Sequence, residues 1–189
     1  MRYEQILATV IISLLSGTIG AYLVSTGRDP LKTGPVAPPT AIEKVAQSGK
    51  LRCGYILNEP GFTKSDSGAF GGIWYRVTEA IAQRAKLETV WTTATTPETL
   101  IADLKADKFD ALCSGMTPDL ALAKDATFSA PAYSQENKPL GYVVPAKAVD
   151  LRDFFSLGLT ELQRDGAMET ILQKFDNPAA PLQRVKSAP

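Results

Sequence analysis

The chain has 189 residues, in which 20 basic and 20 acidic side chains cancel and histidine is absent. This length fits one globular domain with appendages, and the balanced charge offers no basic surface for nucleic acid. Without histidine, Ser-His-Asp and Cys-His catalysis are excluded, and two cysteines are too few for a four-thiolate zinc site.

An uncharged apolar run, Ile6–Val24, lies near the start of the chain and is followed by Arg28. Its 19 residues approach the ~20 that a helix needs to cross the hydrocarbon core of a membrane. We therefore predict that residues 1–24 are either an uncleaved anchor in the inner (cytoplasmic) membrane or a signal peptide whose cleavage leaves the protein in the periplasm. Both alternatives place the remaining chain outside the cytoplasm.

Residues 25–40 contain four prolines, which interrupt any continuous helix, and few apolar side chains that could pack. They are predicted to form a semi-extended linker, and residues 177–189 a flexible tail. The globular domain is therefore expected at residues 41–176.

The domain is predicted to open with a short helix at residues 41–47, because Thr40 and Glu43 form a capping box. The run KLRCGYIL at residues 50–57 alternates toward a buried strand, and glycines and prolines mark residues 58–71 as a loop.

Helices and strands then alternate along the chain. One helix buries a face that contains Ile73, Val77 and Ile81. Strands are expected at residues 89–93 and 109–114, and helices are expected to open at Thr96-Pro97 and at Thr117-Pro118. This alternation predicts a parallel sheet covered by helices, with a ligand beyond the carboxyl ends of its strands, near residues 58–71 and 114–117.

Four runs carry a resemblance to a known family: GKLRCGY, GIWYRVTEAIAQRAKLE, TTPETLIADLKADKFDALCSGMTP and AKDATFSAPAYS. In order and spacing they resemble the family 3 extracellular solute-binding proteins, the periplasmic components of polar amino-acid ABC transporters. The resemblance implies an α/β fold: a type II periplasmic-binding-protein-like lobe with a mainly parallel sheet flanked by helices, here preceded by one N-terminal transmembrane or signal helix.

In the family, a hinge strand leads to a second lobe, and a return strand and two helices follow. Here PLGYVVP at residues 139–145 supplies one strand, and residues 150–175 match the closing helices, with the break between them at Asp165-Gly166. The resemblance therefore implies the first lobe and its closing helices, without the second lobe.

The resemblance also implies ligand contacts at Phe62, whose ring would stack on the ligand, and at Ser114, Gly115 and Thr117, which would present hydroxyls and amides at a helix start. The alternative for Thr117 is that it is simply the cap of its helix.

Five positions depart from the family pattern, among them Thr127 and Ala130, where the family has aspartates. Leu122 aligns with the arginine that clamps the ligand carboxylate, and leucine cannot supply a bidentate cation. Trp74 and Arg76 stand at the usual acidic positions after the first loop; Arg76 either supplies a cation or lies on a solvated helix face. We therefore expect solute binding to be weak or altered.

Cys53 and Cys113 fall on the first and third strands, which lie side by side in this fold. Outside the cytoplasm they either form a disulfide or stay as two buried free thiols that pack as small apolar side chains.

The function expected from these observations is a membrane-tethered, extracytoplasmic solute-binding-like domain related to amino-acid ABC transport. Its partners would be a small polar solute such as an amino acid, and an ABC permease or another membrane protein. No cofactor, metal or enzymatic activity is expected, because Glu59 is the only obvious carboxylate near the predicted cleft.

The alternative is a non-catalytic protein-interaction or self-associating module, including a homodimer. In that case the uncovered former cleft would expose an apolar face to a partner protein, made of Phe62, Trp74, Tyr75 and Met116.

Overall fold

The computed structural model describes residues 37–177 and 181–185. Those from residue 39 onward belong to one compact unit. The predicted N-terminal segment, most of the predicted linker and the last residues of the predicted tail lie outside the described residues. Within the described part of the chain, no helix is both long enough and apolar enough to cross a membrane.

The helices are interspersed with strands along the chain. They are α2 (Ala41–Ser48), α3 (Ile73–Arg84), α4 (Leu100–Lys105), α5 (Val149–Arg164), α6 (Ala167–Gln173) and the 3-10 helix η1 (Leu120–Leu122). The strands are β1 (Lys50–Tyr55), β2 (Thr63–Lys64), β3 (Phe70–Gly71), β4 (Glu88–Ala94), β5 (Ala111–Met116), β6 (Ala126–Phe128), β7 (Tyr133–Gln135), β8 (Lys138–Pro145) and β9 (Gln183–Arg184).

The main sheet has the strand order β4-β1-β5-β8-β7-β9, and β6 pairs with β8 as well. β4, β1 and β5 are parallel, whereas β8 is antiparallel to β5, β6 and β7. The α/β architecture predicted from the sequence is confirmed. The parallel part comprises three strands, and the sheet as a whole is mixed because β8 returns from the β7 hairpin.

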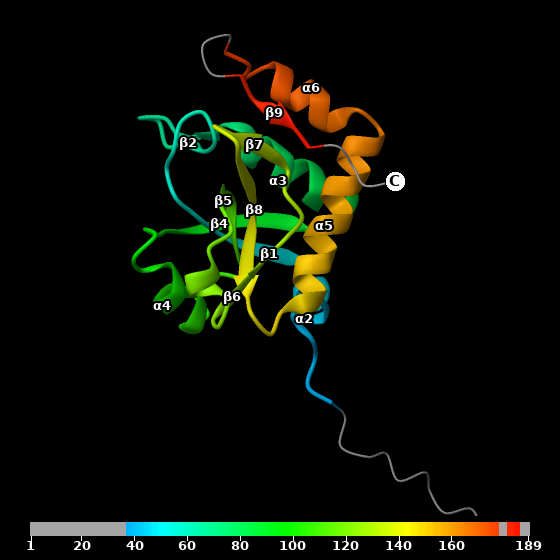
Figure 1. Ribbon diagram of the computed structural model, residues 1–189. Helices are drawn as coiled ribbons and strands as arrows, with labels where there is room; N and C mark the ends of the chain where they lie inside the picture. Colours follow the sequence, from blue (N-terminus) through cyan, green and yellow to red (C-terminus); the bar gives the residue numbers. More distant parts are fainter. Residues whose placement is uncertain (1–36, 178–180, 186–189) are drawn as a thin grey trace, which may run out of the picture. The chain divides into compact units, whose positions relative to one another are not determined.

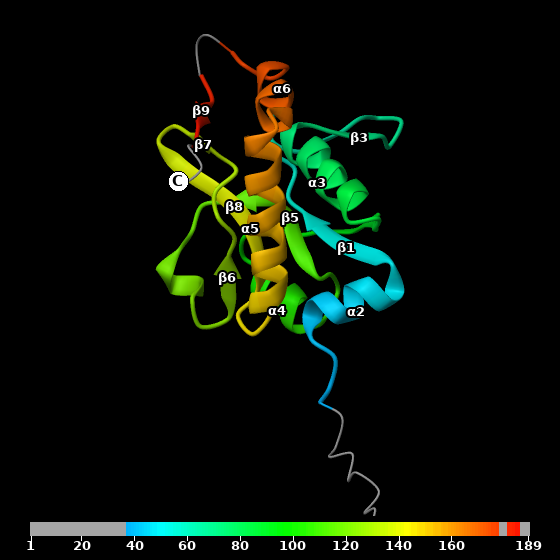
Figure 2. The same ribbon diagram turned by 90° about the vertical axis from the view of Figure 1, so that its right-hand side faces the viewer.

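Helices cover both faces of this sheet. α2, α3, α5 and α6 pack on one face, where Figure 2 shows α5 crossing in front of the strands, and α4 packs on the other face (Figure 1). The side chains of β5 alternate between the two cores: Ala111 and Cys113 belong to the larger core, and Leu112 to the smaller one beside α4. The period of two thus sends neighbouring residues of β5 into different cores.

The start of α2 agrees with the predicted capping box. The Thr40 Oγ1 accepts a hydrogen bond from Glu43 N, and Thr40 N donates to Glu43 Oε2 at 2.8 Å. A carboxylate from α5 satisfies a further amide of this first turn, because Asp150 Oδ2 accepts from Ile42 N at 2.8 Å. The beginning of the domain is therefore tied to its closing helices.

A two-residue hairpin joins β7 to β8. Gln135 pairs with Lys138, and the two turn residues, Glu136 and Asn137, have φ angles of 51° and 62°. Positive φ at both positions is the signature of a type I′ turn, which matches the twist of the flanking strands. The hairpin turns the chain back, so that β8 pairs with β7 on one side and with β5 on the other.

The predicted helix opening at Thr117 is wrong. β5 continues to Met116, and only the 3-10 turn η1 follows, capped by Asp119, whose carboxylate accepts from Ala121 N at 2.8 Å. The physical reason is that this segment has no continuous apolar face to bury: Leu120 is 90% exposed. A helix gains most of its stability from such a face.

Candidate functional site

The candidate site lies at the carboxyl ends of β1 and β5. Ser114, near the end of β5, is fully buried, and its Oγ accepts a hydrogen bond from Ile56 N, just after β1, at 2.9 Å. The hydroxyl that the resemblance assigns to ligand binding therefore joins the two strands. Its acceptor capacity is used for a backbone amide that would otherwise lose a partner.

Gly115 has a φ of 74°, a region that favours glycine. The indole of Trp74 lies directly against it: a Cβ built on Gly115 would stand 2.0 Å from Trp74 Cε2. Any side chain at position 115 would overlap this indole. The backbone of the predicted ligand wall is thus covered by a tryptophan.

Trp74 is fully buried near the N-terminus of α3. The Trp74 backbone amide donates to Gly61 O at 2.8 Å, and the preceding amide of Ile73 donates to Pro60 O at 3.2 Å. Carbonyls of the first loop therefore satisfy the first amides of α3, in place of a side-chain cap. This docking fixes the direction in which the indole enters the core.

The Trp74 ring belongs to a buried aromatic cluster. It meets Tyr142 edge to face with ring centroids 5.0 Å apart, and its centroid lies 5.6 Å from that of Tyr133. Tyr142 in turn is held by Thr78, whose Oγ1 lies 3.0 Å from the Tyr142 Oη. The indole is thus enclosed by rings on one side and by the backbone of Gly115 on another.

Two polar atoms in this cluster, Trp74 Nε1 and Tyr133 Oη, have no hydrogen-bond partner among the described residues. Burial raises the pKa of the Tyr133 hydroxyl above its usual range. The nearby Trp74 N–H opposes this shift, although the two groups do not meet hydrogen-bond geometry. Buried polar atoms without partners are uncommon in folded proteins.

Phe62 lies in a second aromatic cluster. It is fully buried, its ring stacks on Tyr55 at a centroid distance of 5.1 Å, and the centroid of Trp91 is 4.7 Å away. The ring that the resemblance assigns to stacking on a ligand is already packed by other rings. The exposed face expected for a protein-interaction module is wrong for Phe62 and for Trp74, because both are 0% exposed.

Thr117 and Leu122 follow β5. Thr117 is half-buried and begins no α-helix, so it is not the cap expected as the alternative to ligand binding. Leu122 packs against the smaller core, which contains Leu100 and Leu104. The position that aligns with the family's arginine therefore contributes to apolar packing. Arg76 is exposed on α3, with its guanidinium 5.9 Å from the ring centroid of Phe175.

Cys53 and Cys113 form a disulfide between β1 and β5, with sulfurs 2.10 Å apart and Cα atoms 5.4 Å apart. Both residues are fully buried. Cys113 directly precedes Ser114 in the chain. The disulfide and the hydrogen bond from Ile56 N to Ser114 Oγ therefore join the same two strands close to the candidate site.

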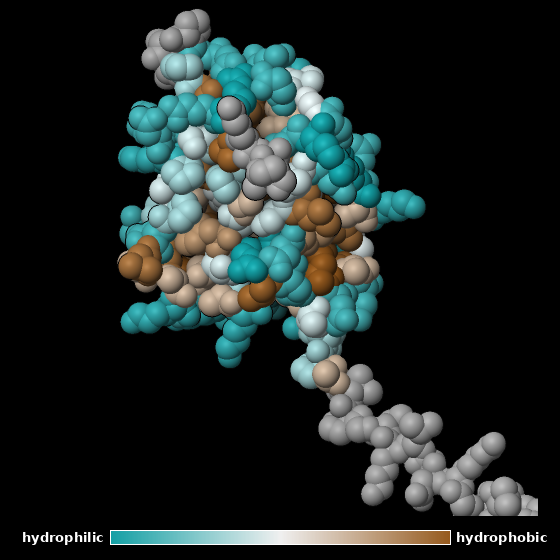
Figure 3. Space-filling model, turned by 45° about the vertical axis from the view of Figure 1, so that its right-hand side comes forward, coloured by the Kyte–Doolittle hydropathy of each residue, from teal (hydrophilic) through white to brown (hydrophobic). Residues whose placement is uncertain are grey.

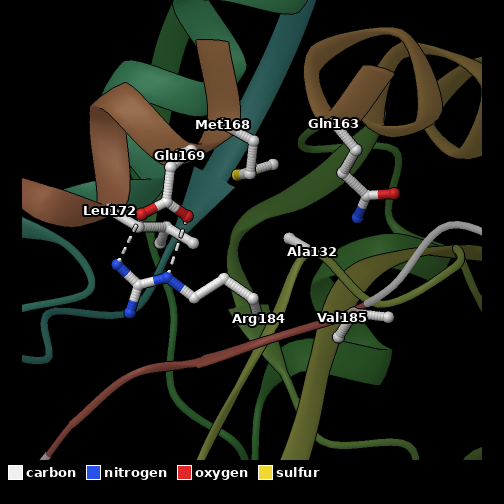
Figure 4. Close-up of a pocket in the computed structure, with 7 residues that line it drawn as sticks. All are labelled: Ala132, Gln163, Met168, Glu169, Leu172, Arg184 and Val185. Carbon is white, nitrogen blue, oxygen red and sulfur yellow. Dashed lines mark hydrogen bonds and ion pairs between the residues drawn. The ribbon is translucent and has the colours of Figure 1, made fainter. Parts of the chain in front are cut away.

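Two cavities lie elsewhere on the lobe. One, of about 270 Å³, lies between α6 and β9, where Arg184 pairs with Glu169 at 2.9 Å (Figure 4). The other, of about 440 Å³, is lined by η1, β6 and the start of α5. Neither is lined by Phe62, Ser114, Gly115 or Thr117. Figure 3 shows separate apolar patches among hydrophilic side chains on one face.

The structure thus brings Ser114 and Gly115 against Trp74 and places Phe62 in another cluster. The sequence had marked Trp74 as a departure from an acidic position and as part of an apolar face, without indicating its contact with Gly115. The signal that could have revealed its role is the pairing of a large ring at position 74 with a glycine at position 115, which have complementary volumes.

Comparisons with known proteins identify the family and the fold. A model of the bacterial extracellular solute-binding proteins, family 3, matches residues 51–177. The chain is similar to the arginine-bound form of domain 1 from TmArgBP, with 26% identity and a TM-score of 0.56 over 63% of this chain and 98% of that chain.

Two further solved structures share the fold. A mutant of ArgBP from T. maritima has 16% identity and a TM-score of 0.62, covering 72% of this chain and 99% of that one. The ancestral amino acid-binding protein AncCDT-1, a precursor of cyclohexadienyl dehydratase, has 16% identity and a TM-score of 0.66, with the same coverage of 72% and 99%. No curated protein matches the chain.

Proposed function

Because this chain belongs to the bacterial extracellular solute-binding proteins of family 3, we propose that it is a single-lobed, membrane-tethered solute-binding-like domain with altered recognition of small polar solutes such as amino acids. Proteins of this family are extracytoplasmic, and the described lobe is related to amino-acid-binding proteins. The observation that carries the proposal is that the match to this family, residues 51–177, falls within one compact unit.

One lobe can suffice to hold a solute. Domain 1 from TmArgBP, which is 26% identical to this chain, has an arginine-bound form. A single lobe covers less of a ligand's surface than the ~70–90% that good pockets bury. The affinity of this lobe for a solute is therefore low. Here Leu122 in place of a cation and Trp74 against Gly115 lower it further.

Isothermal titration of the purified full chain with arginine, glutamine and other amino acids tests this proposal. We expect dissociation constants of about 1 mM or weaker, which correspond to about −4 kcal/mol. Submicromolar affinity for any of them would contradict the altered binding. Absence of heat with every amino acid at millimolar concentrations would contradict solute binding itself.

The tether and the transport partner are part of the same proposal. Residues 1–24 would anchor the lobe beside an ABC permease in the inner membrane, because their apolar run in the sequence has the required length. Membrane fractionation of cells that make the full chain, followed by a carbonate wash, tests the anchor. Release of an intact-length chain by the wash would contradict it, and release of a shortened chain would indicate a cleaved signal.

The proposed domain is not an enzyme. Glu59, the carboxylate expected nearest the cleft, is exposed and lines neither cavity, and general acid–base catalysis needs an acid positioned against an enclosed substrate. Since one structural neighbour is a precursor of cyclohexadienyl dehydratase, an assay of that dehydration checks this point. Turnover that disappears in Glu59→Gln would contradict the non-catalytic proposal.

A second candidate function is self-association of the lobe. Leu120 is 90% exposed and lies at the wall of the 440 Å³ cavity, together with Val149, which is 43% exposed. A protruding apolar side chain beside its own groove suits a twofold contact, in which each copy places its leucine in the groove of the other. Sedimentation equilibrium tests this: a dimer that Leu120→Lys dissociates supports it, and a monomer at millimolar concentration contradicts it.

A further inference from the structure

Position 115 and position 74 form a matched pair. A Cβ at Gly115 would lie 2.0 Å from Trp74 Cε2, 2.1 Å from Cζ2 and 2.3 Å from Nε1. All three distances are far below van der Waals contact, so the indole ring occupies the place where a side chain would stand. Gly115 leaves the room that the indole fills, and its φ of 74° disfavours other residues as well.

The indole is held firmly in this place. Its ring meets Tyr142 and Tyr133, and Tyr142 is fixed by a hydrogen bond to Thr78. The backbone of Trp74 is fixed by the carbonyl of Gly61. These contacts hold the ring within the larger core, so it leaves Gly115 only if the core around it rearranges.

The same space contains the two buried polar atoms without partners, Trp74 Nε1 and Tyr133 Oη. Each carries a desolvation cost that a hydrogen bond would offset. In a binding site, polar groups without a protein partner can form hydrogen bonds with the bound molecule. In a closed apolar core, the same groups only destabilise the fold. The cluster therefore combines polar groups suited to a small molecule with a ring that fills the room for it.

We propose that Trp74 is the specificity-determining residue of this lobe, because its indole occupies the part of the solute site on Gly115 that a free amino acid would need. This inference rests on the proposed solute-binding function. It identifies the Trp74 indole as the group that limits which solutes bind. Removing the indole leaves a space lined by Gly115, Tyr133 and Tyr142, with the Tyr133 hydroxyl available to a ligand. Apolar cavities made in this way bind planar molecules of matching size.

The test titrates full-length Trp74→Ala and the wild-type chain with indole and with arginine, and follows the Gly115 amide by NMR. For Trp74→Ala we expect each probe to bind at least about tenfold more tightly than to the wild type, with shifts of the Gly115 amide. The matched control is Trp91→Ala, which removes the same side chain from the other aromatic cluster. This control should leave arginine affinity and the Gly115 amide unchanged.

The outcomes separate the two proposals. A folded Trp74→Ala chain that binds both probes no more tightly than the wild type overturns the role of Trp74. Arginine binding to the wild type at Gly115, as tight as to Trp74→Ala, also overturns it and leaves the solute-binding function standing. Indole binding at Gly115 in Trp74→Ala, without arginine binding to either chain, supports the occlusion by Trp74 and contradicts the solute-binding function.

A second variant avoids dependence on the folding of Trp74→Ala. The chain has two tryptophans, so Trp91→Phe leaves Trp74 as the only one. Under the proposal, arginine that changes the NMR shift of the Gly115 amide must displace the Trp74 indole. Displacement exposes the indole to water, so the emission of Trp74 should move to longer wavelength and acrylamide should quench it more strongly. An arginine-induced shift of the Gly115 amide with unchanged Trp74 fluorescence would show that both fit together and would overturn the inference.

Discussion

Ser114 illustrates how a residue with a family role in binding can serve the fold. Its Oγ accepts from Ile56 N and is fully buried, so the residue is committed to the junction of β1 and β5. Thr117, three positions later, is half-buried and has a different environment. The two hydroxyls should therefore respond differently to removal.

Replacing Ser114 by alanine should lower the free energy of unfolding by about 1–3 kcal/mol, because the amide of Ile56 then loses its partner in a buried place. Urea denaturation of the full chain measures this. Thr117→Ala is the matched control and should change the stability by no more than about 0.5 kcal/mol. Equal effects of the two substitutions would contradict the structural role of Ser114.

Asp103 on α4 is a buried carboxylate with two close partners. Lys108 Nζ and Thr95 Oγ1 each lie 2.6 Å from one of its oxygens. The hydrogen bond from Lys108, followed by that from Thr95, lowers the pKa of Asp103 below its ordinary value.

A lowered pKa in the folded state makes stability depend on pH in the acid range. Below about pH 4, the ordinary value for aspartate, the unfolded chain binds more protons at this position than the folded chain. The stabilisation is therefore complete above that pH and is lost as the pH falls through the folded-state pKa. Urea midpoints between pH 2 and 6 should fall less steeply for Asp103→Asn and for Lys108→Met than for the wild type, and identical slopes would refute this.

At the scale of elements, the hairpin between β7 and β8 brings the chain back across the sheet. Its turn, Glu136 and Asn137, is exposed and makes the β7–β8 connection as short as two strands allow. An exposed turn between two paired strands tolerates additional chain, since the entropic cost of closing a loop grows slowly with its length.

A flexible insertion of about twelve glycine and serine residues between Glu136 and Asn137 should lower the unfolding free energy by only about 2 kcal/mol, the cost of closing a longer loop. The chain should keep its circular dichroism spectrum and a cooperative urea transition. The same insertion between Leu159 and Thr160, inside helix α5, whose inner face packs in the larger core, is the control and should abolish the fold. Loss of cooperativity with both insertions would contradict the independence of the hairpin.

The elements that the sequence predicted are those with a local signal. The capping box at Thr40 predicted α2, apolar periodicity predicted α3, and the Asp165-Gly166 break separated α5 from α6. The short strands β6, β7 and β9 have two or three residues and owe their conformation to partners that are distant in sequence. No pattern of such length can identify them.

The candidate site was less predictable for the same reason. The resemblance to the family assigned Ser114, Gly115 and Thr117 to ligand contact, and the rule that ligands bind at strand ends indicated the same region. The contact between Trp74 and Gly115, by contrast, joins positions that lie 41 residues apart, by their numbering. Which way a buried ring turns is decided by packing in three dimensions, so the sequence alone marked Trp74 as unusual without indicating what it covers.

For the whole molecule, the disulfide between Cys53 and Cys113 is the main covalent constraint. It joins β1 to β5 near the middle of the sheet and closes a loop with a sequence separation of 60 residues, which contains α3, β4 and α4. A cross-link of this span lowers the entropy of the unfolded chain and leaves the folded lobe as it is.

Replacing both cysteines by alanine should lower the free energy of unfolding by about 2–4 kcal/mol. Urea denaturation of the oxidised wild type and the double variant measures the difference, and the wild type unfolded with a reductant should resemble the variant. Mass measurement with and without reductant checks that the bond is present in the purified protein. Equal stabilities of the oxidised chain and the double variant would contradict the stabilising role.

The order of the strands has a consequence for the synthesis of the protein. β9, at Gln183–Arg184, pairs with the edge of β7, at Tyr133–Gln135, and Leu182 beside it is buried in the larger core. The polypeptide is made from its N-terminus, so β7 emerges well before the strand that covers it. Its backbone donors and acceptors are open to foreign strands during that interval. A chaperone that protects extended segments would therefore act on this edge, until the last strand of the sheet has left the ribosome or the export channel.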